Sequence, residues 1–244
     1  MFSFIISALK IIFLLGFLIF IHEGGHFIVA KLCKVRVNEF AIGFGPTIWK
    51  KQSKETKYAL RLIPLGGFVN MEGETEASDK EDAFNNVSIP KRMAIVAAGA
   101  TVNIIFGIIV FLILISVSYG DIAIGVKETG NFLLSIINSL KMLILGKVGI
   151  NDLSGPVGIS KVVTQTAGIA QYVYILSVVS VSLGATNLLP IPALDGGKIV
   201  LLIIEGIRKK PLKQEVEAQI QLVGFSFLIA LSIYVTYNDV IRII

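Results

Sequence analysis

Residues 11–31 read IIFLLGFLIFIHEGGHFIVAK, an apolar run that ends with two histidines and a glutamate. The run begins near Phe2 and reaches Ala30, with Lys10 near its start. About 20 apolar residues cross the hydrocarbon core of a bilayer, so residues 2–30 are predicted to span a membrane as a helix. Ionisable side chains are costly at that depth, so those at the end of this run indicate a function.

The composition of the chain supports a membrane protein. Of its 244 residues 54% are hydrophobic, and the mean hydropathy is +0.80. Three further apolar runs are predicted to span the membrane, at about 93–117, 169–194 and 220–237. The expected fold is therefore a polytopic α-helical membrane protein with four transmembrane helices in a single membrane-embedded domain, residues 1–244.

Two other regions are expected to lie at or near the membrane surface. Residues 35–72 alternate apolar and polar side chains between Gly and Pro, which predicts a small antiparallel sheet or hairpin insertion, cytosolic or re-entrant. Residues 131–145 carry their polar side chains on one helical face, which is typical of an interfacial helix. The acidic stretch 72–86 is predicted to be a solvated flexible loop.

The distribution of basic residues predicts the orientation. The net charge is +5, but the basic residues lie beside the apolar runs. Their positions therefore indicate the orientation of the chain in the membrane and predict no nucleic-acid partner. Residues 118–168 contain only four lysines and no arginine. The positive-inside rule then places in the cytosol the loop between the first and second predicted spans and the loop between the third and fourth. Both chain ends are then predicted to lie outside. These loops carry Lys31, Lys34, Arg36, Lys50, Lys51, Lys54, Lys57, Arg61, Lys91 and Arg92 in the first, and Arg208, Lys209, Lys210 and Lys213 in the second.

The HEGGH segment has the spacing of a zinc-hydrolase motif. His22 and His26 are four residues apart, so on a helix both imidazoles reach one metal ion. Glu23 is placed to hold a water molecule and accept its proton, while zinc lowers the pKa of that water to about 7. The alternative is a pair of polar residues satisfied by neighbouring helices.

A catalytic zinc needs a third protein ligand, and the chain has no third histidine. The remaining choices are a carboxylate at membrane depth or Cys33, the only cysteine, which lies at the end of the same helix. Asp195 is favoured because Pro190 and Pro192 break the helix before it, although it could instead be a helix N-cap. Glu205 lies near Arg208 and Lys209, so it is more simply interpreted as an interfacial residue that pairs with one of them.

Two asparagines lie in apolar segments. Asn187, eight residues before Asp195, is a candidate for binding a peptide substrate or the oxyanion, or for an interhelical hydrogen bond. Asn103 has the same two readings, and for it the structural role is favoured.

Several segments together identify a resemblance. HEGGH, IPLGGFVNMEGE, FNNVSIPKR, AAGATVN, LSGPVGISK and NLLPIPALDGG occur in the order seen in the site-2 protease family of intramembrane zinc metalloproteases, and the chain most resembles its bacterial regulator-of-sigma-E protease branch. The resemblance implies one Zn²⁺ per chain bound by His22, His26 and Asp195, with Glu23 as catalytic base. It also implies a bacterial cytoplasmic (inner) membrane protein whose site faces the cytosolic side.

The resemblance implies a substrate class and a binding mode as well. Substrates would be single-span membrane proteins, such as anti-sigma factors or remnant signal peptides, trimmed beforehand by a site-1-type protease. The hairpin at 61–71 would offer an edge strand to an extended substrate, which makes Leu65, Gly66 and Gly67 candidate substrate-binding residues.

The sequence departs from the family pattern in two places. Ala100 stands where the family usually has proline. Only about a dozen residues separate Tyr119 from Phe132, too few for the PDZ domain found there in many members, so the chain is expected to lack it by nature or by deletion. The alternative function is a non-catalytic zinc-binding membrane protein or metal transporter. A non-catalytic scaffold would not need Glu23, which is not a proposed ligand. A transporter would need ionisable residues along a path through several spans, whereas this chain concentrates them at one depth.

Overall fold

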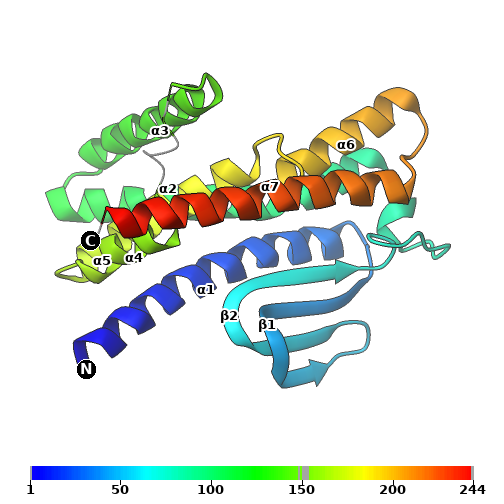
Figure 1. Ribbon diagram of the computed structural model, residues 1–244, viewed down its shortest axis with the longest axis horizontal. Coiled ribbons are helices and arrows are strands. Elements are labelled where there is room, and N and C mark those ends of the chain that lie inside the picture. The colour runs from blue at the N-terminus through cyan, green and yellow to red at the C-terminus, as the bar shows by residue number, and fades with distance from the viewer. Residues whose placement is uncertain (1, 148, 150–153, 243–244) are drawn as a thin grey trace. The chain divides into compact units, whose positions relative to one another are not determined.

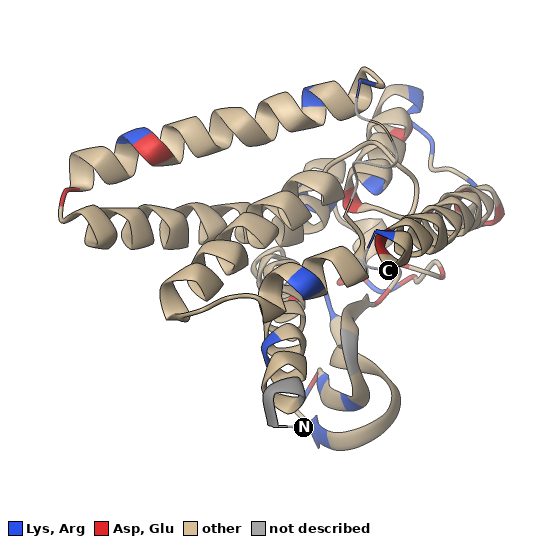
Figure 2. Ribbon diagram, turned by 60° about the vertical axis from the view of Figure 1, so that its left-hand side comes forward, with Lys and Arg blue, Asp and Glu red and all other residues tan. Residues whose placement is uncertain are grey.

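The computed structural model describes residues 2–147, 149 and 154–242, and it is mainly helical (Figure 1). Within these described residues, four helices are long and apolar enough to cross a membrane: α1 (Phe2–Leu32), α2 (Ile89–Tyr119), α5 (Ile169–Asn187) and α7 (Gln214–Ile241). Lys, Arg, Asp and Glu are sparse along most of these helices and more frequent in the sheet and loops (Figure 2). The prediction of a four-span helical membrane protein with a small sheet after the first span is confirmed.

The chain divides into two compact units. The first contains Met1–Ile11, Ile105–Ser182 and Ser226–Ile244, and the second contains Ile12–Ile104 and Leu183–Phe225. All four predicted site residues of the zinc centre fall in the second unit.

In the first unit, the predicted interfacial helix is longer than expected. Helix α3 runs over Ile122–Ile144 and begins nine residues before the predicted start, because the Asp121 side chain caps it by accepting a hydrogen bond from the amide of Ala123 at 2.7 Å. Gly125 lets α3 approach α2 closely, since a Cβ there would collide with Ser116. The rings of Phe111 and Phe132 stack between the two helices at 4.4 Å.

Residues 154–161, the described part of the LSGPVGISK segment, have a structural role in the same unit. Helix α4 (Pro156–Thr164) begins directly after Gly155. The buried carboxylate of Asp239, on α7, accepts hydrogen bonds from the amides of Gly155 and Gly158 at 2.9 and 2.8 Å. A charged acceptor at a helix N-terminus satisfies amides that have no intrahelical partner, so this contact fixes α4 to α7.

The second unit contains a strongly bent two-stranded sheet. Strands β1 (Val37–Gln52) and β2 (Lys57–Met71) pair with shifts of register, and residues 39–42 of β1 have partners in both 57–60 and 67–70 of β2. Gly43 and Gly45 have φ of +87° and +82°, conformations that favour glycine, and Pro46 follows them. These residues turn β1 back along β2.

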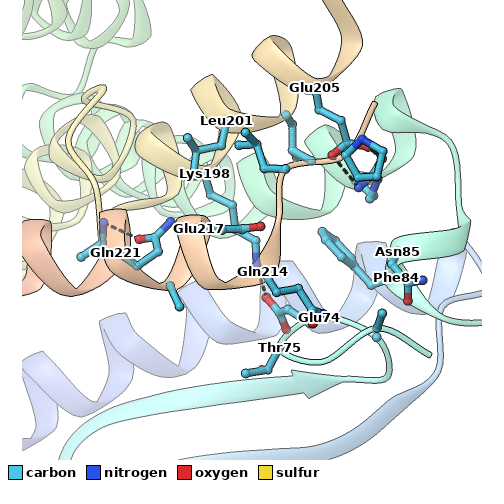
Figure 3. A pocket seen from close by; sticks show the side chains of 18 of the residues that line it. Glu74, Thr75, Phe84, Asn85, Lys198, Leu201, Glu205, Gln214, Glu217 and Gln221 are labelled. Atoms are coloured by element: carbon cyan, nitrogen blue, oxygen red, sulfur yellow. Dashed lines mark hydrogen bonds and ion pairs between the residues drawn. The ribbon is translucent and has the colours of Figure 1, made fainter. Parts of the chain in front are cut away.

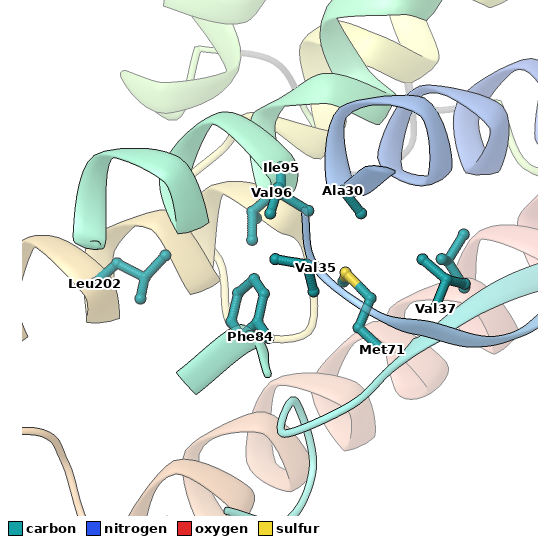
Figure 4. Packing of buried hydrophobic residues seen from close by; sticks show 9 residues of the cluster. Ala30, Val35, Val37, Met71, Phe84, Ile95, Val96 and Leu202 are labelled. Carbon is teal, nitrogen blue, oxygen red and sulfur yellow. The ribbon is translucent and has the colours of Figure 1, made fainter. Parts of the chain in front are cut away.

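A hydrophobic cluster joins this sheet to the helices of the unit (Figure 4). It combines residues from the end of α1, from both strands, from α2, and from helix α6 (Asp195–Arg208). Its buried members are Ala30, Val35, Val37, Val69, Met71, Phe84, Ile95, Val96 and Leu202.

Side-chain hydrogen bonds and ion pairs hold the acidic stretch after β2 in place. Glu72 accepts hydrogen bonds from Ser78 and Asn38 and pairs with Lys80, and these contacts hold the pKa of Glu72 down at about 2. Arg36 pairs with Asp82 at 2.8 Å. Phe84–Asn86 forms a short 3₁₀ helix, η1, whose Phe84 side chain enters the hydrophobic cluster. The pattern of charges alone did not predict these tethers.

The predicted third span ends earlier than expected. Helix α5 stops at Asn187 because Pro190 cannot donate a backbone hydrogen bond and disfavours helix in the residue before it. The chain then runs without helix until α6 starts at Asp195. Within the break, Ala193 has φ of +72° and its amide donates to Oε1 of Gln221, on α7, at 2.6 Å.

The two glycines of HEGGH provide a matched test of helix packing. A Cβ on Gly25 would lie 2.7 Å from the carbonyl oxygen of Ala98, on α2, whereas a Cβ on Gly24 would meet nothing within 4 Å. We expect Gly25→Ala to destabilise the protein by about 1–3 kcal/mol through overpacking. Gly24→Ala should be neutral or stabilising by about 0.5–1 kcal/mol, because alanine favours helix.

Thermal unfolding of both variants in the same detergent measures this difference. Equal midpoints for the two variants would contradict the close approach of α1 and α2 at Gly25.

Candidate metal centre

The two histidines and Asp195 come together although about 170 residues separate them in sequence. His22 and His26 lie one turn apart on α1, with their Nε2 atoms 3.2 Å from each other. Oδ2 of Asp195 lies 3.3 Å from Nε2 of His22 and 3.6 Å from Nε2 of His26. The candidate ligand atoms of the three residues all lie within 4.8 Å of one another.

Asp195 reaches the histidines because α6 begins beside the broken end of α5. It is the first residue of α6 and makes no capping hydrogen bond, since the N-cap is Leu194. The alternative N-cap role is therefore wrong. Gly196 and Gly197 pack directly on the backbone of residues 188–192, where a Cβ would collide with carbonyl groups. Two consecutive glycines are needed here so that α6 can start this close to the preceding turn.

The residues present fit a zinc ion. Oδ2 of Asp195 is buried and has no hydrogen-bond partner among the described residues, although it lies beside two imidazole nitrogens. A buried carboxylate oxygen without a donor is costly, and a cation between it and the two nitrogens removes that cost. Two histidines and one carboxylate are also a known ligand set of catalytic zinc.

Hydrogen-bond partners at the Nδ1 atoms of the two histidines set the tautomers of their rings. Nδ1 of His26 lies 2.8 Å from the carbonyl oxygen of Ile95, which can only accept, so Nδ1 carries the proton and Nε2 is left with its lone pair. The amide of Asn103 lies 3.4 Å from Nδ1 of His22. If His22 binds a metal through Nε2, its Nδ1 carries the proton, and the oxygen of the Asn103 amide can accept that proton in a hydrogen bond.

Helix α2 contributes more to the centre than the sequence analysis recognised. Gly99 leaves room for the ring of His26, since a Cβ there would collide with Nε2. The Ile95 carbonyl, Gly99 and Asn103 follow each other at intervals of four residues along one face of α2. The small residues of AAGATVN were the available signal for such a close approach.

Glu23 lies beside both the centre and the sheet. It is close enough to His26 and Asp195 to interact with both electrostatically. A Cβ on Gly67 would lie 3.0 Å from Cγ of Glu23, so β2 passes directly over the glutamate. Gly66 has φ of +100° and packs under the ring of Phe44. Leu65 belongs to β2, but its side chain lies outside what the structure describes.

The other candidate ligands are placed elsewhere. Cys33 packs against the hydrophobic cluster and does not belong to the group of ligand atoms. Glu205 pairs with Arg92, on α2, and not with the basic residues that follow it in sequence. Asn187 is the last residue of α5 and makes no side-chain hydrogen bond within the described part of the chain, so its substrate-binding role stays a prediction.

A cavity of about 1090 Å³ adjoins the centre (Figure 3). Asp195 lines it together with the segment after β2, the exposed side of α6 and the first half of α7. The Lys198 ammonium group crosses it to Glu74 at 2.6 Å and lies over the ring of Phe84. The cavity therefore connects the Asp195 carboxylate with the ion pair of Lys198 and Glu74.

Comparisons with known proteins identify the chain as similar to zinc metalloproteases. The family model of Peptidase family M50 matches residues 10–231. A candidate zinc metalloprotease of Clostridium acetobutylicum is 30% identical over an alignment that covers 93% of this chain and 95% of the relative. The zinc metalloprotease RasP of Bacillus licheniformis is 24% identical, with 97% of this chain and 99% of the relative covered. The first alignment extends over 321 positions and this chain has 244 residues, so that relative contains residues without a counterpart here.

A match over most of the chain, together with helices able to cross a membrane, decides the class. This membrane-embedded chain belongs to Peptidase family M50, the site-2 proteases, and is a zinc metalloprotease.

Proposed function

We propose that this protease hydrolyses peptide bonds within the transmembrane segments of single-span membrane proteins, as a step of regulated intramembrane proteolysis. The observation that carries the proposal is the meeting of His22, His26 and Asp195 on membrane-spanning α1 and the adjoining α6, with Glu23 between them and β2. A soluble hydrolase would have no reason to place such groups in a span.

Each residue has a distinct part in the reaction. His22, His26 and Asp195 would hold the zinc ion, whose Lewis acidity lowers the pKa of water and polarises the peptide carbonyl. Glu23 accepts the proton of the attacking water and passes it to the leaving amine nitrogen. The Asn187 amide is proposed to donate to the carbonyl oxygen of the substrate as negative charge develops there.

Strand β2 supports a binding mode for the substrate. A helix in the membrane keeps its peptide groups hydrogen-bonded, so a cleavable segment must unwind and find new partners. Addition of the extended segment to β2 would satisfy those groups. Because Gly66 and Gly67 bring the β2 backbone beside Glu23, this addition would set a peptide bond next to the base.

The proposed setting follows from the charges and the cavity. The bacterial origin of the similar proteins favours a bacterial cytoplasmic membrane location. The basic loops favour an orientation with the centre toward the cytosol and both chain ends outside. The cavity beside Asp195 is proposed as the route by which water reaches the centre. Anti-sigma factors or remnant signal peptides, shortened by an upstream site-1-type protease, are the proposed substrates.

The first test separates zinc binding from hydrolysis. Glu23→Gln removes the base but none of the three metal-binding side chains. We expect about one zinc per chain to be retained, while cleavage of a membrane-span substrate falls by about 10²–10⁴-fold, the contribution of a positioned general base. Zinc content by elemental analysis and cleavage in proteoliposomes measure the two effects. A variant that still cleaves at the native rate would refute the role of Glu23.

The second test concerns a residue that is not a ligand. Gly99→Ala should displace the ring of His26, because the new methyl group would occupy the position of that ring. We expect zinc affinity to fall by about 10–100-fold, as for other changes that disturb ligand orientation. Gly24→Ala, which adds the same group to open space, is the control. Equal zinc affinity in the two variants would contradict the packing of Gly99 on His26.

A further inference from the structure

The second half of β1 forms an exposed ribbon with the facing part of β2. Every residue of β1 from Phe44 to Gln52 is exposed, on both faces of the strand. Large apolar side chains are among them, with Ile48 59% and Trp49 53% exposed, and Leu62 of β2 is 60% exposed. In water such a ribbon would be an aggregation site, so a chain embedded in a membrane most simply places it against lipid.

The polarity of the ribbon changes along its length. At the glycine bend, Phe44 faces Ile63. Next come Ile48 and Trp49, the latter opposite Leu60. Toward the turn between the strands the side chains are Lys50, Lys51, Gln52 and Lys54. Apart from Arg61, which pairs with Glu39 and donates to the carbonyl oxygen of Gly45, the ribbon is therefore apolar at the bend, aromatic in the middle and basic at the turn.

The spacing of these zones matches a membrane interface. A strand rises about 3.3 Å per residue, so Ile48 and Lys51 are about 10 Å apart. The headgroup region of one leaflet is about 5–8 Å thick, and tryptophan concentrates at that level. Ile48 would therefore lie in the hydrocarbon, Trp49 at the membrane interface and Lys51 at the level of the phosphates.

The turn is held at the level where α1 ends. Lys31, in the last turn of α1, pairs with Glu55 at 2.9 Å, and the Thr56 hydroxyl donates to the carbonyl oxygen of Val37 at 2.8 Å. Since α1 is a candidate span, its end and the turn lie at the same membrane surface. The bend then points back along α1 into the bilayer.

The basic end of the ribbon carries uncompensated charge. Lys50, Lys51 and Lys54 are exposed, and no acidic partner is found for them among the described residues. The two neighbouring glutamates are already paired, Glu55 with Lys31 and Glu39 with Lys57 and Arg61. Three free ammonium groups beside an interfacial tryptophan attract an anionic surface.

We propose that the ribbon of residues 44–54 is a contact site for anionic phospholipids. Phe44, Ile48 and Trp49 enter the leaflet in which α1 ends, and Lys50, Lys51 and Lys54 bind its phosphate headgroups. Each lysine near such a surface strengthens binding about fivefold.

The contact also reaches the catalytic centre, a consequence that rests on the proposed function. The Phe44 ring covers Gly66, and the next residue, Gly67, lies against Glu23. A ribbon seated in lipid therefore fixes the segment of β2 that is proposed to receive the substrate. Anionic lipid should raise the rate of cleavage as well as bind the ribbon.

The test uses Trp49, which is the only tryptophan of the chain. The protein of residues 1–244 is placed in nanodiscs of phosphatidylcholine, or of phosphatidylcholine mixed with phosphatidylglycerol, and its tryptophan fluorescence is recorded. In the anionic discs we expect emission at shorter wavelength and weaker quenching by aqueous acrylamide. This readout needs no catalytic activity, so it can fail or succeed independently of the proposed function.

Two triple variants complete the experiment. Lys50→Gln/Lys51→Gln/Lys54→Gln should abolish the difference between the two lipids. Lys209→Gln/Lys210→Gln/Lys213→Gln removes the same charge from the loop between α6 and α7 and should preserve the difference. Identical spectra of the native protein in both lipids would overturn the proposal, as would a lipid dependence that survives in the first variant or disappears in both.

Discussion

The second unit depends on the approach of one carboxylate to two imidazoles. Oδ2 of Asp195 lies within 3.6 Å of Nε2 of both His22 and His26, and it has no hydrogen-bond donor among the described residues. A buried charge in that position needs a compensating cation. The close packing of Gly99 on His26 and of Gly196 on the α5 break serves to hold these three side chains together.

The sequence predicted the secondary-structure elements better than their boundaries. Apolar runs mark spans because the bilayer tolerates little else, and the HEGGH spacing places two imidazoles on one helical face. A chain with two histidines then leaves few choices for a third ligand, which led to the prediction of Asp195, and the structure places Asp195 beside both imidazoles. The end of α5 was placed too late, because apolar residues continue through a break that Pro190 enforces.

The contacts between distant segments could not be predicted in this way. The hydrogen bond from His26 to the Ile95 carbonyl involves a backbone group, which carries no residue-specific signal. The pairing of Glu205 with Arg92, and not with its sequence neighbours, depends on how α2 and α6 pack. The position of Gly67 over Glu23 depends on the bend of β1, where two glycines with positive φ turn the strand. Each of these contacts joins parts of the chain that only the fold brings together.

The ligand set of the zinc ion is the central claim, and X-ray absorption spectroscopy at the zinc edge tests it most directly. Two histidines and one aspartate predict a first shell of nitrogen and oxygen at about 2.0–2.2 Å, with outer-shell scattering from two imidazole rings. A sulfur scatterer at about 2.3 Å would mean that Cys33 is a ligand. That result, or scattering from fewer than two imidazoles, would contradict the centre formed by His22, His26 and Asp195.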